Sequence, residues 1–129
     1  REVQTELWDR YGAEAIEILE MDIPGQKTSD DPMGFPRLEA QLRFSIRNSM
    51  VLHLEDFFFR RIPLFAARQD PGIPWIDRLL SIWADELDKS NAEKEAEKAR
   101  LMAEISLREK WPKQCLYQHR LFSFLLSLF

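Results

Sequence analysis

Apolar residues recur at three- and four-residue steps along most of this chain, and clusters of proline and glycine divide the pattern into segments. This spacing places apolar side chains on one face of an α-helix. Strict alternation of apolar and polar residues, which is typical of a half-buried strand, nowhere extends over six residues or more. We therefore predict an all-α fold, a compact bundle of about five helices.

The segment boundaries follow from punctuation residues. Gly12 lies inside the first apolar pattern, where we expect it to mark a close helix crossing. Pro36 is expected in the first turn of the second helix, and Pro63 is expected to stop the third. Ser90 and Glu93 have the spacing of a capping box. The predicted helices cover residues 2–20, 36–50, 54–62, 75–87 and 90–111, followed by an apolar helix at 113–129.

The composition excludes several classes of function. The 129 residues suffice for one domain, and 22 acidic against 18 basic residues give a net charge of −4, which argues against a nucleic-acid partner. A single cysteine, Cys115, allows no internal disulfide and no multi-cysteine zinc site. His53 and His119 lie in unlike contexts, so we expect no metal site. None of the four glycines forms a phosphate loop or a dinucleotide fingerprint, so we expect no catalytic and no cofactor-binding residue here.

Two arginines in the second predicted helix require partners. On a helical wheel, Arg43 and Arg47 fall between two apolar stripes, and a guanidinium in that position needs a carboxylate. In the next helix Glu55 falls within an aromatic arc. We therefore predict that Glu55 pairs with Arg43 or Arg47. One stripe consists of Leu42, Ile46 and Met50, the other of Ala40, Phe44 and Val51, and the remaining face of Arg37, Gln41, Ser45, Asn48 and Ser49.

The same two helices carry further charges. Asp56 and Arg60 are expected to face solvent, whereas Arg61 falls between apolar positions. Two interpretations remain open: a structural ion-pair cluster that fixes the angle between two helices, and an anion site built from the arginines. We favour the structural one because no glycine-rich nest accompanies the arginines. The predicted cluster consists of Arg43, Arg47, Glu55, Asp56, Arg60 and Arg61.

Other chemically suggestive residues have simpler interpretations. His53 precedes two acidic residues, which suggests acid–base chemistry, but its place at a helix start favours a capping role. Cys115 and His119 share a helical face without a further catalytic group, so we interpret the pair as incidental. The charged run from Lys89 to Arg100 is typical of a solvated helix face with i, i+3 and i, i+4 pairs.

The apolar tail beyond Trp111–Pro112 has two interpretations. We favour a last helix packed into the bundle over an interfacial membrane anchor, because few basic residues accompany the apolar ones. No apolar run reaches the length of about 18 residues that a membrane-spanning helix needs, so none is expected. The single cysteine and the lack of a signal segment favour a cytoplasmic setting.

The stretch Leu38 to Phe65, LEAQLRFSIRNSMVLHLEDFFFRRIPLF, resembles a family motif. The C-terminal helical domain of FAD-dependent, quinone-linked glycerol-3-phosphate dehydrogenases has A-E-V-x-Y-A-V-R-N-E, a hydrophobic step, and T-L-E-D-x-x-x-R-R. The matching residues are Ala40, Arg47, Asn48, Leu54, Glu55, Asp56, Arg60 and Arg61, with conservative exchanges at Leu42, Phe44 and Ile46. Further similarities are Arg10-Tyr11-Gly12 and Pro74-Trp75, and departures are Gln41, Ser49 and His53.

The resemblance covers residues 1–110 and leaves the tail 111–129 uncovered. It implies that residues 1–129 form one C-terminal cap domain of a larger flavoprotein, with the FAD and substrate domains outside this fragment. The parent is then expected to oxidise glycerol 3-phosphate to dihydroxyacetone phosphate and to pass electrons to FAD and quinone. A glycerol-3-phosphate oxidase, which uses oxygen, shares this domain. A stand-alone helical interaction module is the rival interpretation.

The resemblance also implies partners for the domain. These are the N-terminal flavin and substrate domain of the same chain, a second copy in a homodimer, and the inner face of the plasma membrane as a peripheral contact of the parent. Exposed aromatic side chains would mark the docking face, although an ordinary core can equally account for four tryptophans and nine phenylalanines. The electron acceptor and the oligomeric state stay open.

Overall fold

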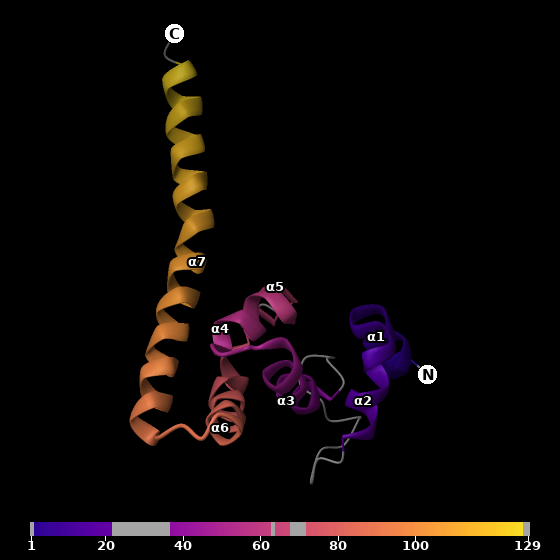
Figure 1. The fold of residues 1–129 in the computed structure, drawn as a ribbon. Helices are drawn as coiled ribbons and strands as arrows, with labels where there is room; N and C mark the ends of the chain where they lie inside the picture. The colour runs from indigo at the N-terminus through magenta and orange to yellow at the C-terminus, as the bar shows by residue number, and fades with distance from the viewer. Residues whose placement is uncertain (1, 22–36, 63, 68–71, 128–129) are drawn as a thin grey trace.

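The computed structural model describes residues 2–21, 37–62, 64–67 and 72–127, and these residues confirm the all-α prediction, because no strand occurs among them. The predicted loop 23–36, Pro36, Pro63 and the turn at 70–71 lie outside the described residues. Figure 1 shows α1 and α2 against one side of α3, with α4, α6 and α7 on the other. The α-helices are α1 (Glu2–Tyr11), α2 (Ala15–Glu20), α3 (Leu38–Ser49), α4 (Leu54–Asp56), α5 (Leu64–Ala67), α6 (Ile76–Glu86) and α7 (Asn91–Ser127).

The first predicted helix is interrupted at Gly12. A short 3₁₀ turn, Gly12–Glu14, separates α1 from α2, and Gly12 has a φ of 58°. A side chain there would meet no atom within 4 Å, so the predicted close helix crossing is wrong. The glycine is instead suited to the left-handed backbone conformation, which L-residues with a Cβ adopt only at a steric cost.

Helix α3 lies between two hydrophobic clusters, as its two apolar stripes predict. Leu42 is fully buried in the larger cluster with α4, α6 and α7, and Phe44 is buried in the smaller cluster with α1 and α2. Two predictions fail at the edges of these stripes. Gln41 and Ser45, assigned to the polar face, are buried, because α1 and α2 cover that side of α3 and the Tyr11 hydroxyl donates a hydrogen bond to Gln41 Oε1 at 3.0 Å. Met50, assigned to a stripe, is 80% exposed.

The third predicted helix combines two helical forms. Helix α4 provides one turn, and a π-helical segment, Phe57–Arg61, continues it. The Ile62 N–H donates to the carbonyl of Phe57, a five-residue step that characterises the π-helix. This segment buries Phe57 and Phe58 completely, so the motif residues 54–61 anchor the larger cluster.

Helices α6 and α7 form the remaining wall of the larger cluster. A short 3₁₀ turn, Ile73–Trp75, precedes α6, which buries Leu79, Leu80 and Trp83. The capping box before α7 is confirmed: Ser90 N–H donates to Glu93 Oε2 at 2.9 Å, and Glu93 N–H donates to Ser90 Oγ at 3.3 Å.

The end predicted at Trp111–Pro112 is wrong, because α7 continues through it as one helix of 37 residues. A proline removes one backbone hydrogen bond, and the turns on either side keep the helical path. Figure 1 shows the C-terminal half of α7 extending away from the other helices, so the predicted return of the tail into the bundle is not seen. In the part of the chain that is described, no helix is long and apolar enough to span a membrane.

Candidate functional site

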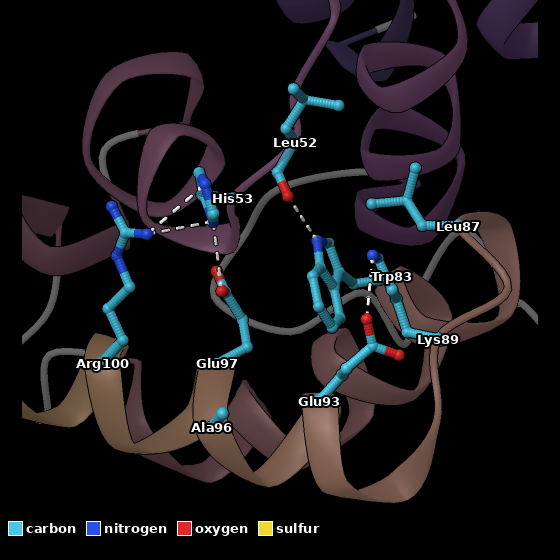
Figure 2. Close-up of a pocket in the computed structure, with 9 residues that line it drawn as sticks. All are labelled: Leu52, His53, Trp83, Leu87, Lys89, Glu93, Ala96, Glu97 and Arg100. Atoms are coloured by element: carbon cyan, nitrogen blue, oxygen red, sulfur yellow. Dashed lines mark hydrogen bonds and ion pairs between the residues drawn. The ribbon is translucent and has the colours of Figure 1, made fainter.

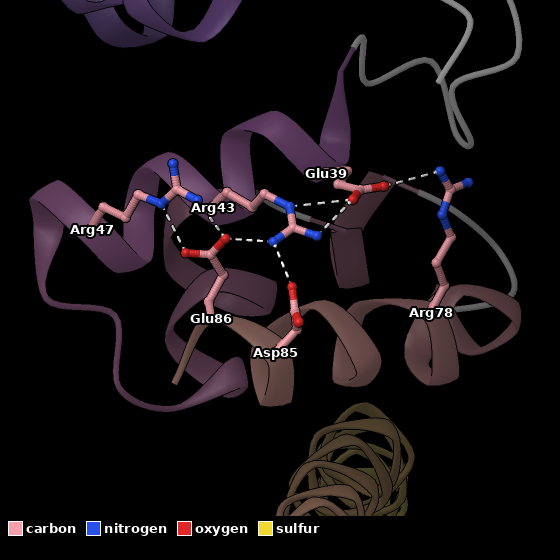
Figure 3. A network of polar contacts seen from close by, with 6 residues as sticks. All are labelled: Glu39, Arg43, Arg47, Arg78, Asp85 and Glu86. Carbon is pink, nitrogen blue, oxygen red and sulfur yellow. Dashed lines mark hydrogen bonds and ion pairs between the residues drawn. The ribbon is translucent and has the colours of Figure 1, made fainter. Parts of the chain in front are cut away.

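A network of ion pairs joins α3 to α6 (Figure 3). Glu86, at the C-terminal end of α6, accepts from Arg47 at 2.7 Å and 2.8 Å through its two oxygens, and also pairs with Arg43. Arg43 further contacts Asp85 at 3.0 Å and Glu39 at 3.1 Å. The side chain of Glu86 is only 8% exposed, so it is the most buried acid of this network. The arginines of α3 therefore fix the packing of α3 against α6.

The network shifts the pKa values of Glu86 and Arg43. The hydrogen bond from Arg47 lowers the pKa of Glu86, and burial opposes that effect without overcoming it. Burial lowers the pKa of Arg43, but hydrogen bonds to Glu86, Asp85 and Glu39 raise it above its ordinary value. Glu86 and Arg43 are therefore charged at neutral pH, and each lies beside an opposite charge. The network therefore supplies no free acid or base for proton transfer.

The predicted pairing of Glu55 with Arg43 or Arg47 is wrong. Glu55 instead accepts from Arg100 of α7 at 2.8 Å, because α6, and not α4, presents acids to α3. Of the other predicted cluster members, Asp56 and Arg60 form an i, i+4 pair at 3.0 Å with an exposed arginine, as predicted for the solvent side. Arg61 is exposed, contrary to its expected place between apolar positions. The six predicted residues therefore do not form one cluster: Arg43 and Arg47 share Glu86, whereas Glu55 and the pair Asp56–Arg60 make contacts elsewhere.

The N-terminus of α4 is capped by Glu97 of α7, which Figure 2 shows beside His53. Glu97 Oε1 accepts the N–H of Leu54 at 2.7 Å, and the residue is only 6% exposed. Because the first N–H groups of a helix lack intrahelical partners, a carboxylate there satisfies a donor and interacts favourably with the helix dipole. His53 occupies the N-cap position but its side chain makes no capping hydrogen bond, so the predicted capping role is wrong in that respect.

The ring of His53 lies between Glu97 and Arg100 of α7 and contacts both. Nδ1 lies 3.2 Å from Glu97 Oε2, and Arg100 Nη1 lies 3.3 Å from each ring nitrogen. One nitrogen cannot both donate to a carboxylate and accept from a guanidinium. We therefore infer that, in the neutral ring, Nδ1–H donates to Glu97 and Nε2 accepts from Arg100. This arrangement holds His53 between α4 and α7 as a structural link.

A pocket of about 590 Å³ lies beside this link (Figure 2). Its centre is apolar, with the Trp83 indole donating to the Leu52 carbonyl at 3.0 Å. One end carries the pair Lys89–Glu93 at 3.1 Å, and the other carries Glu97 and Arg100. The charges that line the pocket are paired within the protein, so its geometry offers no single unpaired charge for a ligand.

The described residues contain no group of three or more histidine, cysteine, aspartate or glutamate side chains placed to hold a metal ion. The positions of the Cys115 and His119 side chains lie outside the described part of the structure. Gly12 and Gly72 are the glycines described, and each sits alone in a short turn. The described backbone therefore provides no glycine-rich phosphate loop that fits a dinucleotide such as FAD.

Sequence reasoning missed the residues that complete these contacts. Glu86 and Glu97 occur in charged segments, where a carboxylate looks solvated. The run from Lys89 to Arg100 was expected to pair within its own helix, yet Lys98 reaches Asp77 of α6 at 2.6 Å and Arg100 reaches α4. The only available signal is periodicity: Glu97 lies four residues before the buried Leu101, on the same side of α7.

One known protein family matches most of this chain. A family described as the C-terminal domain of alpha-glycerophosphate oxidase matches residues 1–94, a shorter span than the 1–110 expected from the motif. The match includes α1 to α6 and the start of α7, and so contains the network of α3 and α6. No curated protein and no solved structure matches the chain. With nearly three quarters of its length matched, the chain belongs to the family of C-terminal domains of alpha-glycerophosphate oxidase.

Proposed function

We propose that this chain is the helical C-terminal cap of a flavoprotein that oxidises glycerol 3-phosphate to dihydroxyacetone phosphate, reducing FAD and then quinone. The observation that carries the proposal is the family match over residues 1–94. The paired charges between α3 and α6, and between α4 and α7, support a structural role, because they compensate one another inside the domain. The FAD and the reacting groups would then be supplied by the rest of the parent chain.

The proposed partner of the cap is the N-terminal flavin and substrate domain of the same chain. Homodimer formation and a peripheral membrane contact of the parent, at the cytoplasmic face of the plasma membrane, are part of the same proposal. The core provides one line of support for a docking cap. Phe44, Phe57 and Phe58 are buried in the core, whereas Trp8 is 52% exposed and accessible to a partner.

A second candidate is the oxidase, in which the reduced flavin passes electrons to oxygen. The matching family, the C-terminal domain of alpha-glycerophosphate oxidase, favours it. The two candidates share the substrate and the flavin and differ only in the acceptor. The acceptor would react at the flavin, so the two candidates are distinguished by the acceptor that the full-length enzyme reduces.

The test uses the full-length product of the gene. We expect bound flavin whose visible absorbance bleaches when glycerol 3-phosphate is added without oxygen, and no bleaching with glycerol, which lacks the phosphate. Electron transfer is then measured to a soluble quinone analogue and, separately, to oxygen by hydrogen peroxide formation. Faster quinone reduction supports the dehydrogenase, and faster peroxide formation supports the oxidase. A full-length product without flavin would contradict both and favour the stand-alone module.

A further inference from the structure

We propose that the turn between α3 and α4, residues 50–52, and the adjacent hollow lined by Arg60 and Arg61 form one docking surface. By this surface the domain docks onto the preceding flavoprotein domain of its own chain. The inference rests on the function proposed above, and it adds the location and the chemistry of the contact. Two features of the described structure carry it: the exposed apolar side chains of the turn, and the charge of the adjacent hollow.

The turn presents two large apolar side chains to solvent. Met50 is 80% exposed and Leu52 is 57% exposed, whereas Val51 between them is only 2% exposed. The chain therefore anchors the turn through Val51 and projects its two neighbours outward. Exposed apolar side chains that are grouped, rather than scattered singly, are typical of an interaction site.

The backbone of Met50 ends α3 in a left-handed conformation. Its φ of 52° and ψ of 39° lie in the left-handed region, which is uncommon for any residue except glycine, asparagine and aspartate. The Met50 side chain is exposed, so burial within the domain does not stabilise this backbone conformation. Met50 is the C-cap residue of α3, and helices commonly end in a left-handed residue, so this conformation ends the helix and turns the chain towards α4. Methionine is well suited to a docking surface because it adapts to irregular partners.

The hollow next to the turn has a volume of about 320 Å³. Its lining includes Arg60, Arg61 and Asp56, a local charge of +1 in a chain whose net charge is −4. The side chain of Arg60 is 79% exposed even while paired with Asp56. An apolar turn beside an excess of guanidinium groups complements an apolar surface that carries carboxylates. The hollow is lined by Ser49, Met50, Val51, Asp56, Arg60 and Arg61.

A protein surface fits these features better than a membrane. Binding to anionic lipid typically uses a cluster of about four to eight basic residues, and the hollow provides two, one of which is already paired. A concave site beside a projecting turn also provides the shape complementarity of a protein–protein contact. Because the matching family consists of C-terminal domains, the preceding part of the same chain is the partner to which we commit.

The test is oxidation of methionine by hydrogen peroxide, read by mass spectrometry, in the 129-residue chain and in the full-length protein. Met50 should be oxidised several-fold more slowly in the full-length protein. Met102, on α7 and 36% exposed, is the internal control and should react at similar rates in both. Equal reactivity of Met50 in the two proteins would overturn the docking surface. So would protection of Met50 in the 129-residue chain by vesicles of anionic lipid, or by raising the concentration of that chain alone.

A charge reversal at Arg61 tests the role of the positive charge in the hollow. In the full-length protein, Arg61→Glu should restore fast oxidation of Met50, and Lys110→Glu, a matched reversal at an exposed position of α7, should not. Slow oxidation of Met50 in both variants would contradict a role of Arg61 in docking. Flavin absorbance separates the two proposals: a protein with flavin but with a reactive Met50 refutes only this surface, whereas a protein without flavin refutes the proposed function on which it rests.

Discussion

Glu97 Oε1 accepts a hydrogen bond from the backbone N–H of Leu54 at 2.7 Å, although the two residues are 43 positions apart. The start of α4 is therefore capped by another helix, because the histidine at the N-cap position leaves the donor unsatisfied. The other oxygen of the same carboxylate lies 3.2 Å from Nδ1 of His53. Arg100, one turn further along α7, pairs with Glu55. Three consecutive residues, His53, Leu54 and Glu55, are thus held by two residues of α7.

Removing this cap should destabilise the domain. We expect Glu97→Ala to lower the free energy of unfolding by about 2 kcal/mol, because a buried donor loses its acceptor. Glu97→Gln keeps one acceptor oxygen and should lose less. Glu95→Ala, at an exposed position of the same helix, is the matched control and should stay within about 0.5 kcal/mol. Urea denaturation measures all three, and equal effects of Glu97→Ala and Glu95→Ala would contradict the capping role.

The acid between the two arginines of α3 should matter more than its neighbour in sequence. Glu86→Ala leaves Arg43 and Arg47 without their shared carboxylate, and we expect a loss of about 1–3 kcal/mol, given that the pair is partly buried. Asp85→Ala should cost less than about 0.5 kcal/mol, because its side chain is 70% exposed. Chemical denaturation compares the two variants. A double-mutant cycle between Glu86 and Arg47 that shows no coupling energy would contradict a working network.

Stability should fall in acid. The pKa of Glu86 is lowered by the hydrogen bond from Arg47, and the pKa of Glu93 is lowered to about 2, chiefly by the backbone N–H of Ser90. Because both folded-state values lie below the ordinary value of 4.5, the folded chain binds fewer protons than the unfolded chain. The contribution of Glu93 is complete well above pH 4.5 and is lost as the pH falls towards about 2, and the contribution of Glu86 is lost as the pH falls below 4.5 through its lowered pKa.

Thermal unfolding recorded across this pH range measures the effect. In Glu86→Gln the acid-induced loss should be smaller than in the unchanged chain, because one of the two groups no longer titrates. Glu95→Gln is the control, with a slope expected to match that of the unchanged chain. If Glu86→Gln keeps the full slope, the low pKa of this carboxyl contributes nothing to folding.

The break between α1 and α2 should depend on backbone conformation alone. Gly12→Ala is expected to cost about 1 kcal/mol, because alanine disfavours a φ of 58°. The added Cβ meets no neighbour within 4 Å, so no packing term contributes. Gly12→Asn should be tolerated better, since asparagine enters this region more readily. Calorimetry that finds alanine and asparagine equally harmful would point to a contact that the described residues do not contain.

The helices were predictable where apolar spacing is strong and the capping signal is local. The two stripes of α3 and the box Ser90–Glu93 depend on neighbours three or four residues apart, and both are present. The break at Gly12 was missed because a glycine in a periodic pattern does not reveal its φ. The end expected at Pro112 failed for the converse reason, since a proline lowers helix propensity without forbidding the helix.

The partners of the charges were harder to predict. A helical wheel shows that Arg43 lies next to apolar positions, but it does not show which helix packs there. The acids were expected on α4 because it follows α3 in the sequence, and they lie on α6. Exposure was also overestimated for Gln41, whose amide is covered because α1 brings Tyr11 across α3. Ion pairs between helices depend on tertiary packing, which a single sequence specifies only weakly.

The hydrogen bond between Glu97 and Leu54 has a consequence for how this polypeptide divides into units. The family match stops at residue 94, three positions before the glutamate that completes α4. Leu101 and Ile105, also past that limit, are buried in the same core as the motif residues. Evolutionary and physical boundaries therefore do not coincide: a truncation at residue 94 would keep every residue of the matched domain and still lack the side chains that seal it.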